Sequence, residues 1–144
     1  MNIVNGSELS IDQLAPYMSD ILREMGRMAR KYPQDITTAS LFQDVLSGKK
    51  TLWLVLDGED LVAIAMSTVR TVDDTGCRIA TLLNLVGKDV AKYAADLCLT
   101  LETWADQNEC SVMAVEGRRG WEPLLAQFGY KPFSVLYRKV AVKA

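Results

Sequence analysis

The stretch TLLNLVGKDVAKYAADLCL, residues 81–99, changes its hydrophobic pattern at one point. Up to Val86 the apolar residues are nearly continuous, which favours a buried strand, and from Val90 they recur at helical spacing. Gly87-Lys88-Asp89 separates the two patterns and predicts a tight break. We therefore expect a long strand that passes almost directly into a long helix, with the other elements arranged around this junction.

The chain before this junction predicts a strand, two helices and a three-stranded antiparallel meander over 51–86. Two β-rich runs flank Asp57-Gly58, which is a hairpin signal. Ser10 and Gln13 form a capping-box pattern at the start of the first helix. The other expected boundaries are a short strand over Met1–Val4, a helix end before Pro33, and a second helix capped by Thr37 or Thr38.

After the junction, the expected helix runs through Trp104, and the strand SVMAVEG over 111–117 should lie parallel to the strand before it. A short helix over Gly120–Phe128 and a final strand, YKPFSVLYRKVAV over 130–142, complete the order. This order predicts an α/β fold with a mixed, mostly antiparallel sheet of six to seven strands and helices on both faces. We expect one domain over 1–144.

The composition narrows the possible chemistry. The 144 residues include no histidine, so a Ser-His-Asp or Cys-His site cannot form within the chain, and a zinc site is disfavoured. The three cysteines match no metal or redox spacing, which leads us to expect no metal and a reducing cytoplasm. No apolar run reaches membrane-spanning length, and the N-terminus lacks the pattern of a secretory signal.

The charge is unevenly distributed along the chain. Residues 117–144 carry six basic residues and one acidic residue, whereas residues 1–116 carry ten basic and seventeen acidic residues. A basic end can face an anionic ligand or an acidic partner, or it can be a solvated edge strand with protective lysines. The overall acidity argues against a nucleic-acid partner.

The order of elements, the strand TLLNLVG, the helix from Asp89, the strand SVMAVEGR and the segment GWEPLLAQFGYKPF resemble the GNAT superfamily of N-acetyltransferases. The pair Gly129-Tyr130 resembles the end of that family's fourth helix. The resemblance implies that acetyl-CoA binds with its pyrophosphate at free backbone N–H groups, which is the chemistry of a helix N-terminus. The cofactor-binding residues implied here are Leu85, Val86, Gly87, Lys88 and Asp89.

Two positions depart from the family pattern. Asp89 stands where its carboxylate should cap the helix, fill the anion site and repel phosphate. Leu125 occupies the position at which the family commonly has the tyrosine that protonates the leaving thiolate. The remaining catalytic candidates are Glu116, at a strand end, and the phenol of Tyr130.

Two arginines stand out in the string Glu116-Gly117-Arg118-Arg119-Gly120-Trp121. Arg118 and Arg119 can grip a carboxylate or a phosphate, or they can be solvated turn residues with Trp121 as a lid on the core. The Gly-Arg-Arg-Gly-Trp string resembles divergent GNAT-like proteins encoded by phages, many of which keep the fold without the enzyme motifs.

Two functions follow from these patterns. The first is an acyl-CoA-dependent N-acyltransferase with a degenerate site, in which a backbone N–H near Leu85 or Val86 holds the oxyanion and a small-molecule or protein amine is acylated. The second is a non-catalytic, phage-encoded interaction or virion-associated protein with a protein partner.

The expected location is the cytoplasm, or the host cytoplasm or virion if the protein is phage-encoded. We expect no membrane partner, and a homodimer through edge strands stays open.

Overall fold

The computed structural model describes residues 1–141, which form one five-stranded sheet in the order β1-β2-β3-β4-β5. Neighbouring strands are antiparallel, except that β5 runs parallel to β4. The mixed, mostly antiparallel sheet and the parallel last pair are therefore confirmed. The strands are β1 (Asn2–Asn5), β2 (Thr51–Asp57), β3 (Asp60–Thr71), β4 (Arg78–Gly87) and β5 (Val112–Val115).

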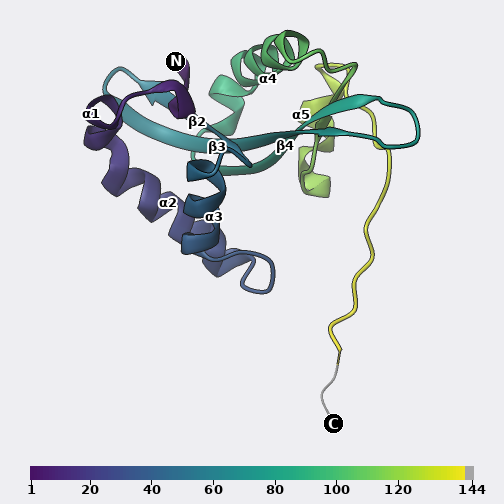
Figure 1. The fold of residues 1–144 in the computed structure, drawn as a ribbon, viewed down its shortest axis with the longest axis horizontal. Helices are drawn as coiled ribbons and strands as arrows, with labels where there is room; N and C mark the ends of the chain where they lie inside the picture. The colour runs from purple at the N-terminus through teal and green to yellow at the C-terminus, as the bar shows by residue number, and fades with distance from the viewer. Residues whose placement is uncertain (142–144) are drawn as a thin grey trace.

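Figure 1 shows α2 and α3 on one side of the sheet and α4 on the other. The capping box predicted at Ser10 is present. Of the two caps predicted for the second helix, Thr37 is the one observed, and it forms a capping box with Ser40. The first helix is divided in two by a 3-10 turn that contains Pro16, which supplies no N–H to an α-helical ladder. The helices are α1 (Ile11–Leu14), α2 (Met18–Lys31), α3 (Thr38–Leu46), α4 (Val90–Gln107) and α5 (Glu122–Ala126).

Two apolar cores form because alternate residues of each strand point to opposite faces of the sheet. Leu52, Leu54 and Leu56 of β2 pack toward α2 and α3. Trp53 and Val55 of the same strand pack toward α4. The indole N–H of buried Trp53 donates to Ser67 Oγ at 2.8 Å, so both of these polar groups are satisfied inside the core. No helix within residues 1–141 is both long enough and apolar enough to cross a membrane.

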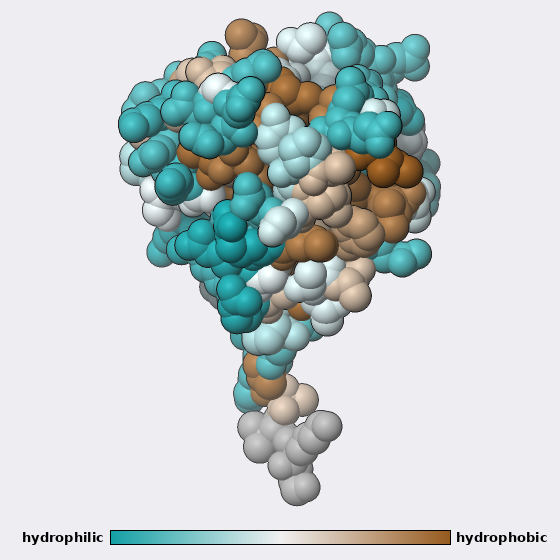
Figure 2. All heavy atoms as spheres, turned by 90° about the vertical axis from the view of Figure 1, so that its left-hand side faces the viewer, coloured by the Kyte–Doolittle hydropathy of each residue, from teal (hydrophilic) through white to brown (hydrophobic). Residues whose placement is uncertain are grey.

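The predicted final strand is wrong for 130–141, and its last residue, 142, lies outside the described residues. This part of the chain is extended but forms no ladder, so the sheet has five strands rather than six or seven. The apolar pattern favours a strand, but a strand also needs a neighbour that accepts and donates its backbone hydrogen bonds. The segment instead projects from the body of the molecule (Figures 1 and 2).

Candidate functional site

Strands β4 and β5 form a fork. They are paired only where Ile79–Leu82 lie beside Val112–Val115, and the Glu116 N–H donates to the Leu82 carbonyl at 2.9 Å where the pairing ends. Beyond Leu82, β4 continues to Gly87 bonded only to β3. Within residues 1–141, the outer edge of 83–87 therefore has no strand partner, and its backbone groups face the space that opens between β4 and the chain after β5.

A bulge in β4 stands at the root of this fork. Met66 pairs with Asn84 and Ser67 pairs with Leu82, so Leu83 is an extra residue in β4. As a result Leu82 and Leu85 pack into the same core, although an odd spacing would place them on opposite faces of a regular strand. The bulge therefore reorients the backbone of the free half of β4.

The turn after β4 is tightly held against β3. Gly87 has a φ of +152°, and a Cβ there would lie 2.5 Å from the Val62 carbonyl oxygen and 2.6 Å from the Ala63 Cα. The Lys88 N–H donates to the same Val62 carbonyl at 3.3 Å. Only glycine leaves room for this approach, and the approach positions the start of α4 at the mouth of the fork.

The prediction that Asp89 caps α4 is wrong. Asp89 adopts the left-handed conformation (φ 58°, ψ 37°), and its side chain accepts no hydrogen bond from the helix. A capping side chain needs an extended backbone, and here the carboxylate lies 3.9 Å from Lys92 Nζ instead. Among the described residues, the Val90 and Ala91 N–H groups have no acceptor. The Asp89 carboxylate therefore does not satisfy the first N–H groups of α4.

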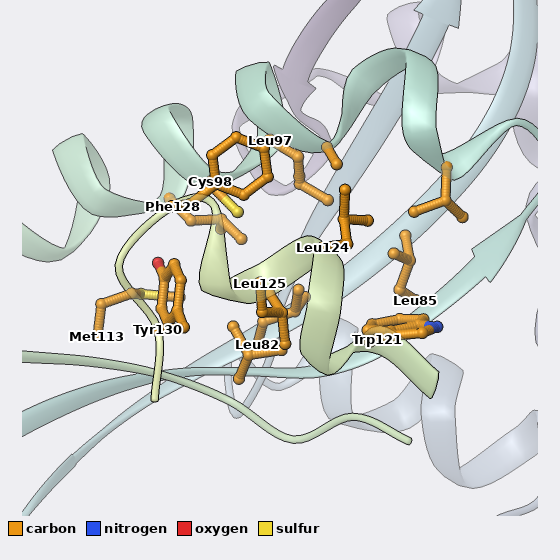
Figure 3. A pocket seen from close by; sticks show the side chains of 14 residues that line it. Leu82, Leu85, Leu97, Cys98, Met113, Trp121, Leu124, Leu125, Phe128 and Tyr130 are labelled. Atoms are coloured by element: carbon orange, nitrogen blue, oxygen red, sulfur yellow. The ribbon is translucent and has the colours of Figure 1, made fainter. Parts of the chain in front are cut away.

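An apolar pocket lies behind the fork, between β4, β5, α4 and α5 (Figure 3). Its volume is about 20 Å³, enough for one water-sized molecule. Trp121 lies beside Leu85 in Figure 3, and its ring covers Gly117, where a Cβ would lie 2.9 Å from the indole. Leu125 also lines the pocket, as its helical spacing predicts, so the pocket wall carries an alkyl group at that position.

The structure does not place both catalytic candidates, Glu116 and Tyr130, at the mouth of the fork. Glu116 is exposed where β5 ends. Tyr130 lies beside Met113, at the other end of the pocket from Leu85 (Figure 3). The Tyr130 hydroxyl is buried and has no hydrogen-bond partner among residues 1–141, and desolvation raises the pKa of this phenol far above its usual value. Their catalytic roles stay predictions.

Arg118 and Arg119 are exposed and lead into the 3-10 turn that precedes α5. Neither forms an ion pair with any of residues 1–141. In the same part of the chain, no group of three histidine, cysteine, aspartate or glutamate side chains could hold a metal ion. The two guanidinium groups are thus available to a ligand or partner, and their role stays a prediction.

No family model and no curated protein sequence matches this chain. Solved structures do match it over nearly their whole length. A glucosamine-6-phosphate N-acetyltransferase from Arabidopsis thaliana has a TM-score of 0.70 at 8% identity, covering 96% of this chain and 97% of its own. An aminoglycoside 6'-N-acetyltransferase from Acinetobacter haemolyticus has a TM-score of 0.65 at 18% identity, covering 99% and 100%.

The chain has the GNAT fold. A protein described as a transcriptional regulator from Bacillus halodurans is similar to the same extent, with a TM-score of 0.72 at 14% identity, covering 97% of this chain and 99% of its own. At these identities the likeness concerns the fold, and the function has to be argued from the site.

One polar group on the GNAT sheet was missed by the sequence analysis. Lys50 Nζ lies 3.3 Å from Asn84 Oδ1 and 3.6 Å from Asp44 Oδ2. Asn84 belongs to the free half of β4, and Lys50 is largely buried. The sequence does contain a signal for this group, because Asn84 is the one polar residue in the apolar run from Leu82 to Val86. This group lies on the face of the sheet that packs against α3, and none of its three residues lines the pocket behind the fork.

Tyr93, in the first turn of α4, is packed in a way that predicts the effect of a substitution on stability. Its side chain is fully buried, and its hydroxyl has no hydrogen-bond partner in the described part of the chain. Burial, with smaller contributions from Asp89 and Glu24, raises its pKa to about 12. We expect Tyr93→Phe to raise the free energy of unfolding by roughly 1 kcal/mol, because the substitution removes an unsatisfied buried polar group.

The same variant changes the dependence of stability on pH. The unfolded phenol ionises near its ordinary value of about 10, whereas the folded one stays neutral up to about 12, so the wild type should lose stability as the pH rises between these values. Denaturant titrations from neutral to alkaline pH should show a smaller loss for Tyr93→Phe. Equal alkaline losses in the two proteins would contradict the assignment.

Proposed function

We propose that this protein is an acetyl-CoA-dependent N-acyltransferase. The observation that supports this most directly is the pair of unsatisfied N–H groups at the start of α4, next to the open edge of β4. Such a helix start attracts anions through free donors and a favourable dipole. Lys88 and Lys92 add positive charge there, and the Asp89 carboxylate is turned toward Lys92.

The residues of the fork fit acetyl-CoA. The N–H groups of Val90 and Ala91 would hold its pyrophosphate, and the apolar side chains of Leu85 and Trp121 would border its pantetheine arm. The pocket has little free volume, so the Trp121 side chain has to move before the pantetheine arm can enter. The bound cofactor would supply an activated thioester carbonyl to an amine.

The strand itself supplies an oxyanion donor. Successive residues of a strand direct their N–H groups to opposite edges, so one of Leu85 and Val86 donates toward β3 and the other toward the fork. A backbone N–H in this position costs no reorganisation when negative charge develops on the carbonyl oxygen. Glu116, or a water held by it, is the group we assign to removing the amine proton.

Binding of acetyl-CoA is the first test. The thermal midpoint should rise in the presence of millimolar acetyl-CoA, because a ligand at a hundredfold excess over its dissociation constant stabilises the native state by about 2.7 kcal/mol. CoA should give a comparable shift, since both carry the pyrophosphate. If neither compound moves the midpoint, the enzyme proposal fails.

Asp89→Gly should increase the affinity for acetyl-CoA several-fold. The substitution removes a negative charge next to the phosphate site and relaxes a left-handed backbone that glycine adopts freely. Glu109→Gly is a matched control, because Glu109 has nearly the same φ, 59° against 58°, but lies at the other end of α4. Titration calorimetry should show tighter binding for Asp89→Gly and unchanged binding for Glu109→Gly. Equal effects would mean that only backbone strain was relieved.

The second candidate is a non-catalytic interaction or virion-associated protein. Leu125, which offers no proton at the wall of the pocket, favours it, and so does the nearly filled pocket. The string over 117–121 supports a phage-encoded form, in which exposed Arg118 and Arg119 would contact an acidic protein partner. The absence of any acetyl-CoA effect, together with a folded protein, would favour this candidate.

A further inference from the structure

The chain that leaves β5 carries charges of both signs that do not neutralise one another. Glu116 is exposed directly after the last residue of β5, and Arg118 and Arg119 are exposed in the turn that follows. Within residues 1–141, none of these three side chains forms an ion pair. Arginine binds a carboxylate readily through its forked guanidinium group. The turn therefore leaves one acidic and two basic groups open to a ligand.

The backbone of this turn is held at both ends. The Glu116 N–H donates to the Leu82 carbonyl at 2.9 Å, and the Trp121 N–H donates to the Arg118 carbonyl at 3.0 Å. Between them, Gly117 lies against the Trp121 ring, where a Cβ would come within 2.9 Å of the indole. The main chain that carries the three charged side chains is thus positioned by the sheet and by the 3-10 turn.

This turn borders the opening of the fork. Glu116 leaves the sheet beside Leu82, where the pairing of β4 and β5 ends. Trp121, at the end of the 3-10 turn, lies beside Leu85 in the free half of β4 (Figure 3). The chain from Glu116 to Trp121 therefore follows one side of the opening, and the free edge of β4 forms the other side.

The two arginines are not required for the phosphates of acetyl-CoA. The start of α4 already offers the N–H groups of Val90 and Ala91, together with the positive charges of Lys88 and Lys92. Residues 117–121 contain no acidic residue that would need a counter-charge. Arg118 and Arg119 are therefore free to bind a second anionic group, close to the carboxylate of Glu116.

The spacing along the chain limits the size of that ligand. Arg118 and Arg119 follow Glu116 by two and three residues, so their Cα atoms lie at most about 7 Å and about 11 Å from the Glu116 Cα. One small molecule can span this distance, with its amine at Glu116 and its anionic group at the arginines. Carboxylate and phosphate both match the fork of a guanidinium group.

We propose that the acyl acceptor is a small amine that also carries a carboxylate or a phosphate group, and that Arg118 and Arg119 hold this anionic group. The inference rests on the enzyme activity proposed above. The acceptor nitrogen forms the bond to the acyl carbon, the carbon–sulfur bond breaks with its electron pair left on sulfur, and the amine proton passes to Glu116 or to a water held by it. The arginines bind and orient the acceptor and take no part in the bond changes.

Two matched pairs of amines test the acceptor class, O-phosphoethanolamine against ethanolamine and β-alanine against propylamine. We expect kcat/KM for acyl transfer from acetyl-CoA to be about tenfold to a hundredfold higher for the anionic member of each pair, as for a hydrogen bond to a charged group. Combining Arg118→Ala with Arg119→Ala should remove this preference, chiefly by raising KM for the anionic amines. Arg70→Ala is the matched control and should keep the preference, since Arg70 is also exposed and forms no ion pair within residues 1–141 but lies beside Ile79, in the paired half of β4.

Acceptor binding can also be measured without turnover. In the presence of CoA, which has no acyl group to transfer, O-phosphoethanolamine should raise the thermal midpoint of the wild type further and ethanolamine should not. The double alanine variant should lose this additional shift and keep the shift caused by CoA alone. The retained CoA shift establishes that the variant is folded and that its cofactor site is intact.

Three outcomes would contradict the inference. Equal kcat/KM within both pairs, in a protein that does transfer acyl groups, overturns the acceptor class and leaves the enzyme proposal standing. A double variant that loses the CoA shift but keeps its preference for anionic amines would mean that the arginines hold the phosphates of the cofactor instead. No transfer to any of the four amines, together with no shift from CoA, overturns both the acceptor class and the enzyme proposal.

Discussion

Gly87→Ala is expected to lower the free energy of unfolding by roughly 2–5 kcal/mol, from overpacking and backbone strain together. A methyl group at Gly87 would meet the Val62 carbonyl oxygen at 2.5 Å and the Ala63 Cα at 2.6 Å. Both are parts of β3 in the middle of the sheet, so neither can move without disturbing the ladder. The turn that positions the N–H groups of α4 should be displaced, and acetyl-CoA binding should be lost with it.

Gly58→Ala separates this effect from the ordinary cost of a positive φ. Gly58 has a φ of +62° in the hairpin turn, and nothing lies within 4 Å of a Cβ there. We expect that variant to lose only about 1–2 kcal/mol and to keep its affinity for acetyl-CoA. Urea titrations and calorimetry on the two variants provide the comparison. Similar losses from both would show that close packing against β3 does not matter.

Leu125→Tyr should accelerate acyl transfer roughly a hundredfold, at the lower end of the usual range of about 10²–10⁴ for a positioned general acid. Leu125 lines the pocket behind the fork, where an added phenol would face the apolar end of the site. In the proposed reaction, α5 offers no proton donor to the CoA thiolate that leaves, because its side chains in the pocket are all aliphatic. The measurement is the release of free CoA thiol in the presence of a panel of small primary amines.

Leu125→Phe is the control for shape. Phenylalanine strains the nearly filled pocket as much as tyrosine does but carries no hydroxyl, so overpacking should cost both variants a similar 1–3 kcal/mol or so of stability. The informative quantity is the ratio of their rates. A ratio near one would mean that the pocket is not where the thiolate leaves.

The local elements were predictable from the sequence because their signals lie within a few residues of one another. Ser10 with Gln13 and Thr37 with Ser40 form reciprocal caps that depend on a spacing of three residues. The pair Asp57-Gly58 likewise predicts the β2–β3 hairpin from two neighbouring residues. The parallel β4–β5 pair followed from the intervening helix, since a parallel partner needs a crossover connection.

The errors arose where the outcome depends on distant residues or on one backbone angle. Residues 130–141 have a strand pattern, but their pairing partner is not encoded in that pattern. Asp89 has the right side chain for a cap, and its left-handed conformation removes the possibility. The extra residue at Leu83 could not be seen either, because a bulge is defined only against the strand it faces.

The extra residue at Leu83 and the glycine at the end of β4 have a consequence for how such a site can be inherited. The donors that they orient belong to the main chain, which every amino acid shares, so the surrounding side chains can be exchanged in large numbers while the donors keep their places. What has to be kept is the count of residues along β4 and the absence of a side chain at Gly87. Insertions and deletions in this strand should therefore be far more damaging than substitutions.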